Sequence, residues 1–493
     1  MSVLEKRNDD TRTMSNLLLL FGTAIVLVSS SVGFVNAFTM DSSMPGMSMP
    51  MVRSSASDPL MGMPLSHMPE MFVAGAGLVI VLIGAVGRGR AAAKARGSSR
   101  GRILVGVIGT AALTIDISKT STLGFVIPGM REEYGLAAGT ASLLAVAGLS
   151  GTATGAVLFG IMSDRIGRRA AYLIATLGFT ATSMCGTMPT FAGNIVMCAL
   201  MGVAVGGLAP LLITLLTEAI GGRSRGSVVV ALSVVATAVG YLVAAGSALW
   251  LEPVFGWRVL WLIGAPTGLV LVLLTPFIPD WSRERAPAPE VEASRPQHAR
   301  TLTTGLQRAY ALLIGVLTFG LTTWVPSLAR AGGVPVGTAN LLLTVAAVAM
   351  VPCALLFMLG YRRFGPVRVA VGLAGATAVL LLALTGSGAV SAAAWVSALA
   401  LVAALFAVNT MAAVFLPIAA DLADSTGRGR ATGTVSLYNR LGGLCGPLLL
   451  AGLVSSASDV LVAVSVLALL CAGAAWYIGR RHRQANQNTP VSS

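Results

Sequence analysis

Long apolar stretches dominate this chain of 493 residues and restrict what it can fold into. Hydrophobic residues make up 55% of the sequence, charged residues make up 11%, and the mean hydropathy is +0.82, which is more apolar surface than a soluble protein can bury. As a helix, an apolar run of about 20 residues spans the roughly 30 Å hydrocarbon core of a bilayer. Alternating segments of about 10 residues, typical of membrane β-barrels, do not occur in the sequence. The sequence therefore predicts an all-α membrane protein.

The first hundred residues predict an N-terminal extension that contains two apolar segments. The extension, residues 1–100, begins with an apolar stretch at 15–38 that fits either a cleaved signal peptide or a retained helix. It continues with an external Met-rich segment at 39–71, a helix at 72–87 and a basic cytoplasmic linker at 88–102.

Twelve further apolar segments fall into two sets of six. We expect helices near residues 103–128, 140–161, 170–188, 193–217, 228–251, 257–278, 306–328, 338–360, 367–386, 392–420, 431–454 and 459–479. The first six form an N-terminal half at 103–279 and the last six a C-terminal half at 305–480. The polar segment 280–304, rich in Pro, Glu and Arg, predicts a flexible cytoplasmic linker, and 481–493 a cytoplasmic tail. Two halves of this kind indicate an internal repeat.

The formal net charge of +14 is distributed as in a membrane protein and not as in a nucleic-acid-binding protein. With the helices above, most of the 33 Lys and Arg residues lie in short loops and tails on one side of the membrane. This asymmetry marks that side as cytoplasmic, and no nucleic-acid partner is expected. The five cysteines all lie in apolar segments, so no disulfide framework is expected.

A charged motif, GIMSDRIGRR at residues 160–169, lies between the second and third of the twelve segments. A degenerate copy without the aspartate, GYRRFG at 360–365, lies between the eighth and ninth. Three further features complete the pattern. The fourth segment carries glycines at Gly202, Gly206 and Gly207, and Glu218 and Arg225 follow it. The sixth segment ends in PDWSR at residues 279–283. Over residues 101–480 this pattern resembles the major facilitator superfamily, and within it the sugar and metabolite:proton symporter branches.

The resemblance implies a gating role for the loop at 160–169. In the superfamily such a loop stabilises the outward-open state, with the aspartate accepting from a helix N-terminus and an arginine. By position, Asp164 is the acceptor, while Arg165, Arg168 and Arg169 are its partners or lipid-facing anchors. Gly160 and Gly167 would allow close packing and a tight turn, and Glu218 and Arg225 would belong to the same gating set. The alternative is a positively charged loop that only orients the protein.

Two departures from the family pattern bear on the type of transport. The helix-4 arginine common in proton-coupled members is absent near Cys198, which weakens the expectation of proton antiport. The helix-5 glycine–proline element of drug antiporters is also absent, which counts against drug efflux.

The first of the twelve segments carries two charges, Asp116 and Lys119, deep in its apolar sequence. With a rise of 1.5 Å per residue they lie roughly 20 Å and 24 Å from the cytoplasmic start of the helix. A charge at that depth costs at least about 2.5 kcal/mol unless it is paired or faces a water-filled cavity. Their spacing places both on one helical face, so they can pair. We expect the pair to face the transport path, with a purely structural ion pair as the alternative.

Arg440 is the corresponding charge in the C-terminal half, about 15 Å into the eleventh segment. Two cations, Lys119 and Arg440, near the membrane midplane of opposite halves favour an anionic substrate, since arginine binds carboxylates bidentately. The alternative is that Arg440 extends its charged end toward the membrane surface, or pairs with Asp421 or Asp424 at the cytoplasmic end of the tenth segment. Candidate uncharged contacts in the same cavity are Asn409, Tyr438 and Asn439.

Methionines are concentrated in the segment at 39–71. Thioethers are soft ligands that select Cu(I) when several converge. The candidate ligands are Met44, Met47, Met49, Met51, Met61, Met63, His67 and Met68. The segment resembles the extracellular Met-rich tails of copper-handling proteins, and the alternative is an unstructured tether.

The sequence predicts a multi-pass secondary active transporter of the inner (plasma) membrane, working by alternating access. We expect proton-coupled uptake of a small organic anion or metabolite, with Asp116 as the protonatable group and Lys119 and Arg440 holding the substrate. The alternatives are a multidrug or metabolite exporter, and a copper-binding or copper-handling membrane protein that uses the Met-rich segment. The expected partners are a small anionic molecule, protons and the lipid bilayer, with copper in the third case. No enzyme chemistry and no cofactor are expected.

Overall fold

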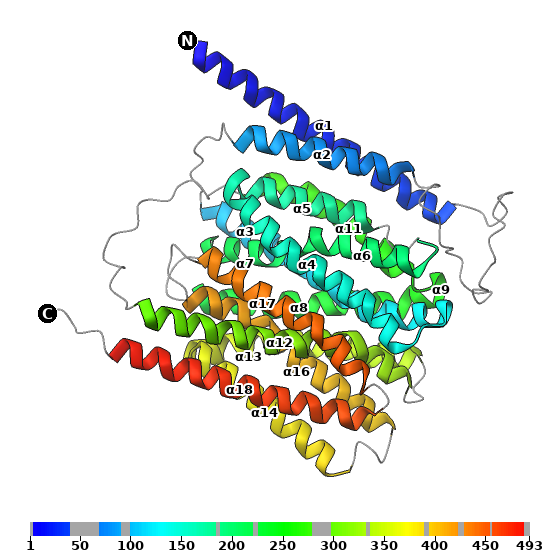
Figure 1. The fold of residues 1–493 in the computed structure, drawn as a ribbon, viewed down its shortest axis with the longest axis vertical. Helices are drawn as coiled ribbons and strands as arrows, with labels where there is room; N and C mark the ends of the chain where they lie inside the picture. Colours follow the sequence, from blue (N-terminus) through cyan, green and yellow to red (C-terminus); the bar gives the residue numbers. More distant parts are fainter. Residues whose placement is uncertain are drawn as a thin grey trace.

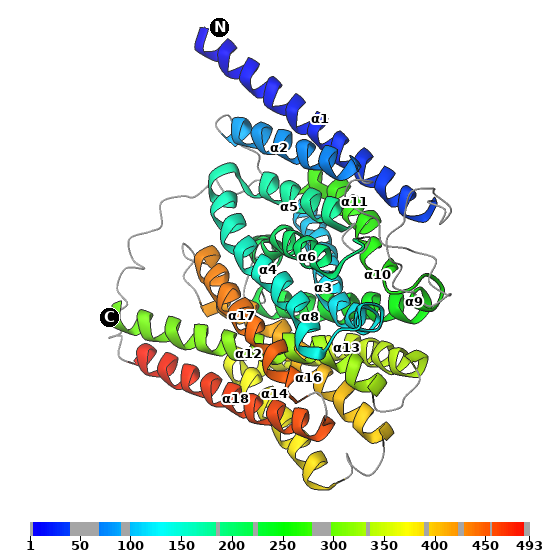
Figure 2. The same ribbon diagram turned by 45° about the vertical axis from the view of Figure 1, so that its right-hand side comes forward.

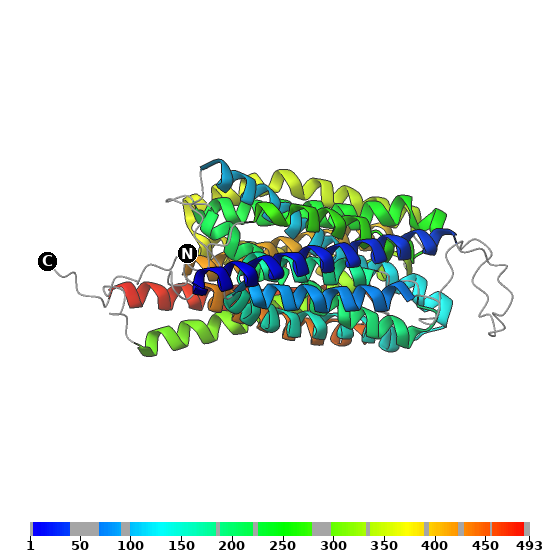
Figure 3. The same ribbon diagram turned by 90° about the horizontal axis from the view of Figure 1, so that it is seen from above.

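The computed structural model describes residues 3–39, 69–89, 99–183, 188–219, 225–278, 297–331, 336–388, 394–422, 428–453 and 456–487. Within these ranges all regular secondary structure is helical, which confirms the predicted fold class. The helices run roughly parallel to one another (Figure 3). In the described part of the chain, eight helices are long and apolar enough to cross a membrane.

The helices form two halves that follow one another in the chain. The N-terminal half comprises α3 (Ser99–Tyr134), α4 (Ala138–Ile166), α5 (Arg168–Thr182), α6 (Phe191–Gly206), α7 (Leu208–Ala219), α8 (Arg225–Trp250), α9 (Glu252–Phe255), α10 (Val259–Leu262), α11 (Gly264–Leu274) and the 3₁₀ turn η3 (Thr275–Phe277). The C-terminal half comprises α12 (Gln297–Ala331), α13 (Val336–Phe364), α14 (Pro366–Gly386), α16 (Ala394–Leu422), α17 (Arg428–Ala451) and α18 (Ala457–Gln487). The halves meet where α4 packs along α17 and α8 packs along α13 (Figures 1 and 2).

Two of the predicted helices are broken in the structure, and both breaks precede a proline. The fourth divides at Gly207 into α6 and α7, three residues before Pro210, and the sixth divides at Ile263 into α10 and α11, three residues before Pro266. Proline has no N–H with which to continue the helical hydrogen-bond ladder, and its ring crowds the carbonyl one turn earlier. The prediction of continuous helices at 193–217 and 257–278 was therefore wrong in detail.

Two predicted polar segments are partly helical. α12 begins at Gln297, inside the predicted linker 280–304, and α18 continues to Gln487, inside the predicted tail. A helix can continue beyond its membrane-spanning part with polar residues. Their side chains are then solvated by water, so they carry no cost of burial in lipid, and many of them favour helix. The linker prediction was therefore too long by the residues 297–304, and residues 279–296 lie outside the described ranges.

The internal repeat appears in the backbone of two turns. Gly167, between α4 and α5, has φ +93°, and Gly365, between α13 and α14, has φ +81°. These values favour glycine, since a side chain in that region clashes with the backbone. The tight turn predicted at Gly167 is present, and its counterpart occurs at the degenerate second copy of the motif.

Glycines bring α12 and α17 into close contact in the C-terminal half. A Cβ at Gly442 would meet the Leu312 backbone, and one at Gly443 would meet the ring of Phe319. The NRLGGLCG sequence at 439–446 therefore allows the two helices to approach closely. This contact fixes the position of Phe319 on α12, which meets Gly443. It also fixes Arg440, which lies within one turn of both glycines on α17.

A buried ion pair joins two elements of the N-terminal half. Arg258, only 2% exposed, donates to Glu133 through Nη1 at 2.8 Å and Nη2 at 2.5 Å. Trp257 Nε1 donates to the same carboxylate at 2.8 Å, and the guanidinium lies 4.5 Å from the Trp257 ring centroid. Bidentate geometry and the added donor satisfy the buried charges, so the end of α3 is held to the start of α10.

The N-terminal extension forms a helical hairpin on the outside of the bundle. α1 (Val3–Thr39) and α2 (Pro69–Gly89) pack against each other and against α5 and α11 (Figure 1). Their contact is close at Gly22 and Gly77, while Val26 and Val81 are fully buried in it. Large apolar side chains such as Phe21 remain exposed on the other face of α1, as expected for contact with lipid. The hairpin contacts the N-terminal half, so we expect it to move with that half.

Candidate functional site

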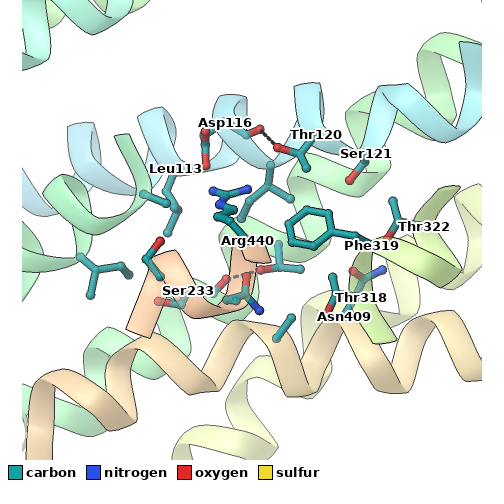
Figure 4. A pocket seen from close by; sticks show the side chains of 17 residues that line it. Leu113, Asp116, Thr120, Ser121, Ser233, Thr318, Phe319, Thr322, Asn409 and Arg440 are labelled. Atoms are coloured by element: carbon teal, nitrogen blue, oxygen red, sulfur yellow. Dashed lines mark hydrogen bonds between the residues drawn. The ribbon is translucent and has the colours of Figure 1, made fainter. Parts of the chain in front are cut away.

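A cavity lies between the two halves of the bundle (Figure 4). Its walls come from α3, α7 and α8 of one half and from α12, α16 and α17 of the other. The lining residues are Leu113, Asp116, Ile117, Thr120, Ser121, Ala209, Ile213, Ser233, Thr237, Thr318, Phe319, Thr322, Asn409, Ala412, Ser436, Asn439 and Arg440. The lining combines an apolar surface with a few polar groups, as in small-molecule sites.

One carboxylate and one guanidinium face each other across the cavity. Asp116 of α3 is 3% exposed and Arg440 of α17 is 6% exposed, and their charges interact (Figure 4). No hydrogen bond joins them among the described residues, and Asp116 Oδ1 and Arg440 Nε have no hydrogen-bond partner there. Two opposite charges buried near each other, each with unsatisfied hydrogen-bonding atoms, can accept a further polar or charged group between them.

Arg440 is held in place by its neighbours in the C-terminal half. Asn439 Nδ2 donates to the Ala311 carbonyl oxygen at 3.2 Å, which fixes the adjoining backbone of α17 to α12. The Arg440 guanidinium lies 5.4 Å from the centroid of the Phe319 ring, within the range of a cation–π contact. Asp116, Asn409, Asn439 and Arg440, all predicted as site residues, line the cavity, and their part in binding stays a prediction.

Tyr438, also predicted as a cavity contact, does not belong to the lining. Its ring lies 5.5 Å from the guanidinium of Arg308 on α12. A helix turns by about 100° per residue, so residues two positions apart point in very different directions. Arg440 therefore faces this cavity while Tyr438 does not, and a contact between Tyr438 and a substrate stays a prediction.

Lys119 is not in the lining of this cavity, but it lines an adjoining one that shares Thr120, Phe319 and Thr322 with it. Its ammonium donates to the backbone carbonyl oxygens of Leu260 at 3.1 Å and Trp261 at 2.5 Å, and it lies 5.6 Å from the Trp261 ring centroid. These carbonyls belong to α10, next to the helix break. The long lysine side chain reaches that break across a gap left by Gly264, where a Cβ would come within 2.5 Å of Lys119 Cε.

This geometry predicts a structural effect for Lys119. Removal of the ammonium takes away a donor of the Leu260 carbonyl, at about 1–3 kcal/mol. The Trp261 carbonyl loses the ammonium but keeps the backbone N–H of Ile263. We expect Lys119→Met to lower the melting temperature of the purified protein in detergent, while the affinity for substrate changes little. An unchanged melting temperature together with weakened substrate binding would return Lys119 to the substrate site.

The sequence analysis missed the hydroxyl-bearing residues and the one aromatic residue of the lining. They recur at helical spacing: Thr120 and Ser121 follow Asp116 by one turn, and Ser233 and Thr237 lie one turn apart on α8. Such spacing of small polar residues within apolar segments indicates a polar face. Phe319 gave no comparable signal, since an isolated phenylalanine in an apolar helix is ordinary.

On the side where α3 and α8 end, the halves touch directly. A Cβ at Gly124 of α3 would meet the carbonyl oxygen of Thr322 of α12. Asn340 Nδ2 of α13, buried between the halves, donates to the Ala248 carbonyl oxygen at 3.2 Å and to Glu252 Oε2 at 3.5 Å. The predicted topology makes this side external. The cavity is therefore closed off by protein contacts on that side.

The predicted gating loop is only partly visible. The side chains of Asp164, Glu218 and Arg225 lie outside the described part of the structure. Gly160 is exposed and has nothing within 4 Å of a Cβ built on it, so the close packing predicted there does not occur. Gly202 and Gly206 do pack closely, against the α4 backbone.

The copper prediction cannot be placed in the structure. Its ligands, Met44 to Met68, lie outside the described residues, as do the side chains of Asp421 and Asp424. Within the described ranges no three His, Cys, Asp or Glu side chains gather as a metal site would require.

Comparison with known proteins agrees with this architecture. The family model described as Major Facilitator Superfamily matches residues 109–402. In structure the chain is similar to a D-xylose–proton symporter, with a TM-score of 0.61, 16% identity, and coverage of 76% of this chain and 97% of the symporter. It is similarly close to the human organic anion transporter MFSD10, with a TM-score of 0.60, 18% identity, and coverage of 77% and 100%. At these identities the likeness concerns the fold.

Among curated relatives, the chain is 32% identical to a putative niacin/nicotinamide transporter of Bacillus subtilis over 36% of this chain and 44% of that protein. It is 30% identical to a gallate transporter of Pseudomonas putida over 44% and 56%. A gentisate transporter of Corynebacterium glutamicum is 27% identical over 58% and 68%. The matches thus span about half the length of the first two relatives.

The chain belongs to the major facilitator superfamily. Its membership and its long apolar helices make it a multi-pass protein of the inner (plasma) membrane.

Proposed function

We propose that the protein takes up a small aromatic carboxylate together with a proton, through the cavity between its two halves. The observation that carries the proposal is the pair formed by Asp116 and Arg440, two opposite charges that face one cavity without closing on each other. The cavity supplies a cation for the substrate and an acid for the proton.

Arg440 is the binding group for the carboxylate. It is the only basic side chain in the described lining of the cavity, and its Nε has no hydrogen-bond partner there. A guanidinium offers a planar set of donors that matches a carboxylate bidentately. A buried arginine therefore favours a substrate with one negative charge.

The aromatic part of the substrate is supported by Phe319 and by the relatives. Phe319 lies beside Arg440, so a ring attached to a carboxylate bound by Arg440 can pack on it, alongside Leu113 and Ile117. Curated relatives are named as transporters of gallate, 4-hydroxybenzoate, gentisate and benzoate. The four named compounds share an aromatic ring that bears a carboxylate. Phe319 and Arg440 offer a surface for such a ring and a cation for such a carboxylate.

Charge neutrality in a buried site couples the proton to the substrate. The empty cavity holds an ionised Asp116 and Arg440, which sum to zero. Addition of a carboxylate alone leaves one negative charge, and addition of a proton alone leaves one positive charge. Either net charge is costly in a low-dielectric interior. The proton and the carboxylate together restore neutrality, so the scheme is a one-to-one, electroneutral symport.

Alternating access would then be a rocking of the two halves about the site. We infer that the Asn340 contacts close the external side, and that Asp164 and the arginines of the 160–169 loop act on the cytoplasmic side. In this scheme both the loaded and the empty neutral cavity can reorient.

Two pairs of ligands, each a carboxylate and the uncharged amide of the same size, test the substrate class. We expect benzoate and nicotinate to raise the melting temperature of the detergent-purified protein, and benzamide and nicotinamide, which match them in size but lack the charge, to have little effect. Stabilisation follows from binding to the native state, and reaches about 2.7 kcal/mol at a concentration of 100 Kd. Stabilisation by the amides and not by the acids would contradict an arginine-centred site.

A further inference from the structure

Two polar side chains in the cavity are not used by the coupling scheme. Asn409 of α16 and Thr322 of α12 are each 6% exposed and both line the cavity. Asn409 Nδ2 and Thr322 Oγ1 have no hydrogen-bond partner within the described ranges. An unsatisfied buried donor or acceptor destabilises a protein, so its retention needs a reason.

Nearby residues of the same types are hydrogen-bonded within the protein. Thr318 and Thr323, on the same helix as Thr322, donate to the carbonyl one turn earlier at 2.8 and 2.6 Å. Asn439, in the same lining as Asn409, donates to a carbonyl of α12 at 3.2 Å. Threonine hydroxyls in apolar helices are normally satisfied in this way. Thr322 and Asn409 therefore keep hydrogen-bonding capacity that their neighbours do not.

The two residues lie apart from the charged pair. In the view of Figure 4, Asp116 and Arg440 lie on one side of the Phe319 ring, and Thr322 and Asn409 lie on the other. In that view the Phe319 ring separates the charged pair from the two uncharged groups. Phe319 and Thr322 also line an adjoining cavity with Lys119, whose ammonium donates to the carbonyls of Leu260 and Trp261. A ligand with the same order of groups would match the cavity that Asp116 and Arg440 line: a carboxylate, a ring, and an uncharged hydrogen-bonding group.

We propose that Asn409 and Thr322 bind a hydroxyl group on the ring of the substrate, so that the preferred substrate is a hydroxylated aromatic carboxylate. The proposal rests on the proposed function, in which Arg440 holds the carboxylate. An amide both donates and accepts, and so does a threonine hydroxyl. A phenolic hydroxyl also does both and can use the two residues together. A second carboxylate would only accept. The other cation that shares a cavity with Thr322 among the described lining residues, Lys119, lies in an adjoining cavity and donates to the carbonyls of Leu260 and Trp261.

Binding of matched ring-substituted probes to the purified wild-type protein tests this inference directly. The probes are benzoate, 3-hydroxybenzoate and 4-hydroxybenzoate, with 3- and 4-fluorobenzoate as substituents that fill space but lack the hydroxyl donor. A hydrogen bond is worth roughly twofold to tenfold in affinity. We expect at least one hydroxybenzoate to bind about fivefold to tenfold more tightly than benzoate and than its own fluoro analogue.

Variants assign the preference to the two residues. The hydroxyl preference is the affinity for a hydroxybenzoate divided by the affinity for benzoate in the same variant. Asn409→Leu and Thr322→Val should each lower this ratio toward one, since each removes about one hydrogen bond. Thr318→Val is the matched control, because its hydroxyl lines the same cavity but is already bonded within α12. It should retain the wild-type preference. Without ligand, Asn409→Leu and Thr322→Val should melt no lower than wild type, because each removes an unsatisfied buried polar group.

The outcomes separate this inference from the proposed function. Equal affinities for benzoate and the hydroxybenzoates in the wild-type protein overturn the hydroxyl site and leave the carboxylate site standing. A preference that survives both variants, or that Thr318→Val removes equally, also overturns it. Failure of every benzoate to bind overturns both proposals together. The wild-type series distinguishes the first and last of these outcomes even if a variant fails to fold.

Discussion

Replacement of Arg440 with glutamine is expected to abolish uptake of aromatic carboxylates and to weaken their binding at least about 30-fold. Removal of one partner of a buried charge pair costs about 2–5 kcal/mol, because the other charge is left without compensation. In Arg440→Gln this applies twice, to the substrate carboxylate and to Asp116. Glutamine keeps hydrogen-bonding capacity, so the loss reports on the charge. Isothermal titration of the purified variant with 4-hydroxybenzoate measures the effect.

Arg308 provides a matched control for this experiment. Its guanidinium lies 5.5 Å from the Tyr438 ring centroid, much as Arg440 lies 5.4 Å from that of Phe319, and it is on α12 of the same half. It does not line the cavity. Arg308→Gln should therefore bind 4-hydroxybenzoate as the wild type does. Near-normal binding by Arg440→Gln, or an equal loss in both variants, would remove the carboxylate site from Arg440.

Asp116→Asn is expected to separate transport from proton coupling. The substitution keeps the shape of the side chain and fixes it as neutral, so the cavity carries one positive charge when empty and none when the carboxylate is bound. The loaded form can still reorient, whereas the empty form is disfavoured by its net charge. Exchange of labelled for unlabelled substrate across the membrane should persist near the wild-type rate. Net accumulation driven by a pH gradient should fall at least about tenfold, since the empty transporter must return for each cycle.

Exchange serves as the internal control for that variant, because it requires a folded and inserted protein. Loss of exchange and of accumulation together would assign Asp116 a structural role. Wild-type accumulation by Asp116→Asn would place the proton site elsewhere in the protein.

Much of the fold was accessible from the sequence because the apolar segments are long and the solvent is lipid. The helical breaks at Gly207 and Ile263 were not predicted, although Pro210 and Pro266 marked both. A proline three residues after a break is as compatible with a kinked helix as with two separate ones, and packing against neighbours decides between them.

The site was accessible in part. Asp116 and Arg440 stand out because charges in apolar segments are costly, so their retention indicates a cavity. Lys119 is also a charge in an apolar segment, and yet its ammonium binds carbonyls of α10. The sequence shows that a buried charge needs a partner, but it does not show whether the partner is a substrate or the carbonyls exposed by a helix break. That distinction depends on the contact between α3 and α10, far apart in the chain.

Uptake into proteoliposomes under two separate driving forces tests the central claim most directly. The purified protein is reconstituted, and accumulation of labelled 4-hydroxybenzoate is followed with either a pH gradient, alkaline inside, or a potassium diffusion potential alone. Electroneutral symport through Asp116 and Arg440 predicts accumulation with the pH gradient, its loss with a protonophore, one proton entering per carboxylate, and no accumulation with the potential alone. Accumulation driven by the potential alone, or uptake that ignores the pH gradient, would contradict the account.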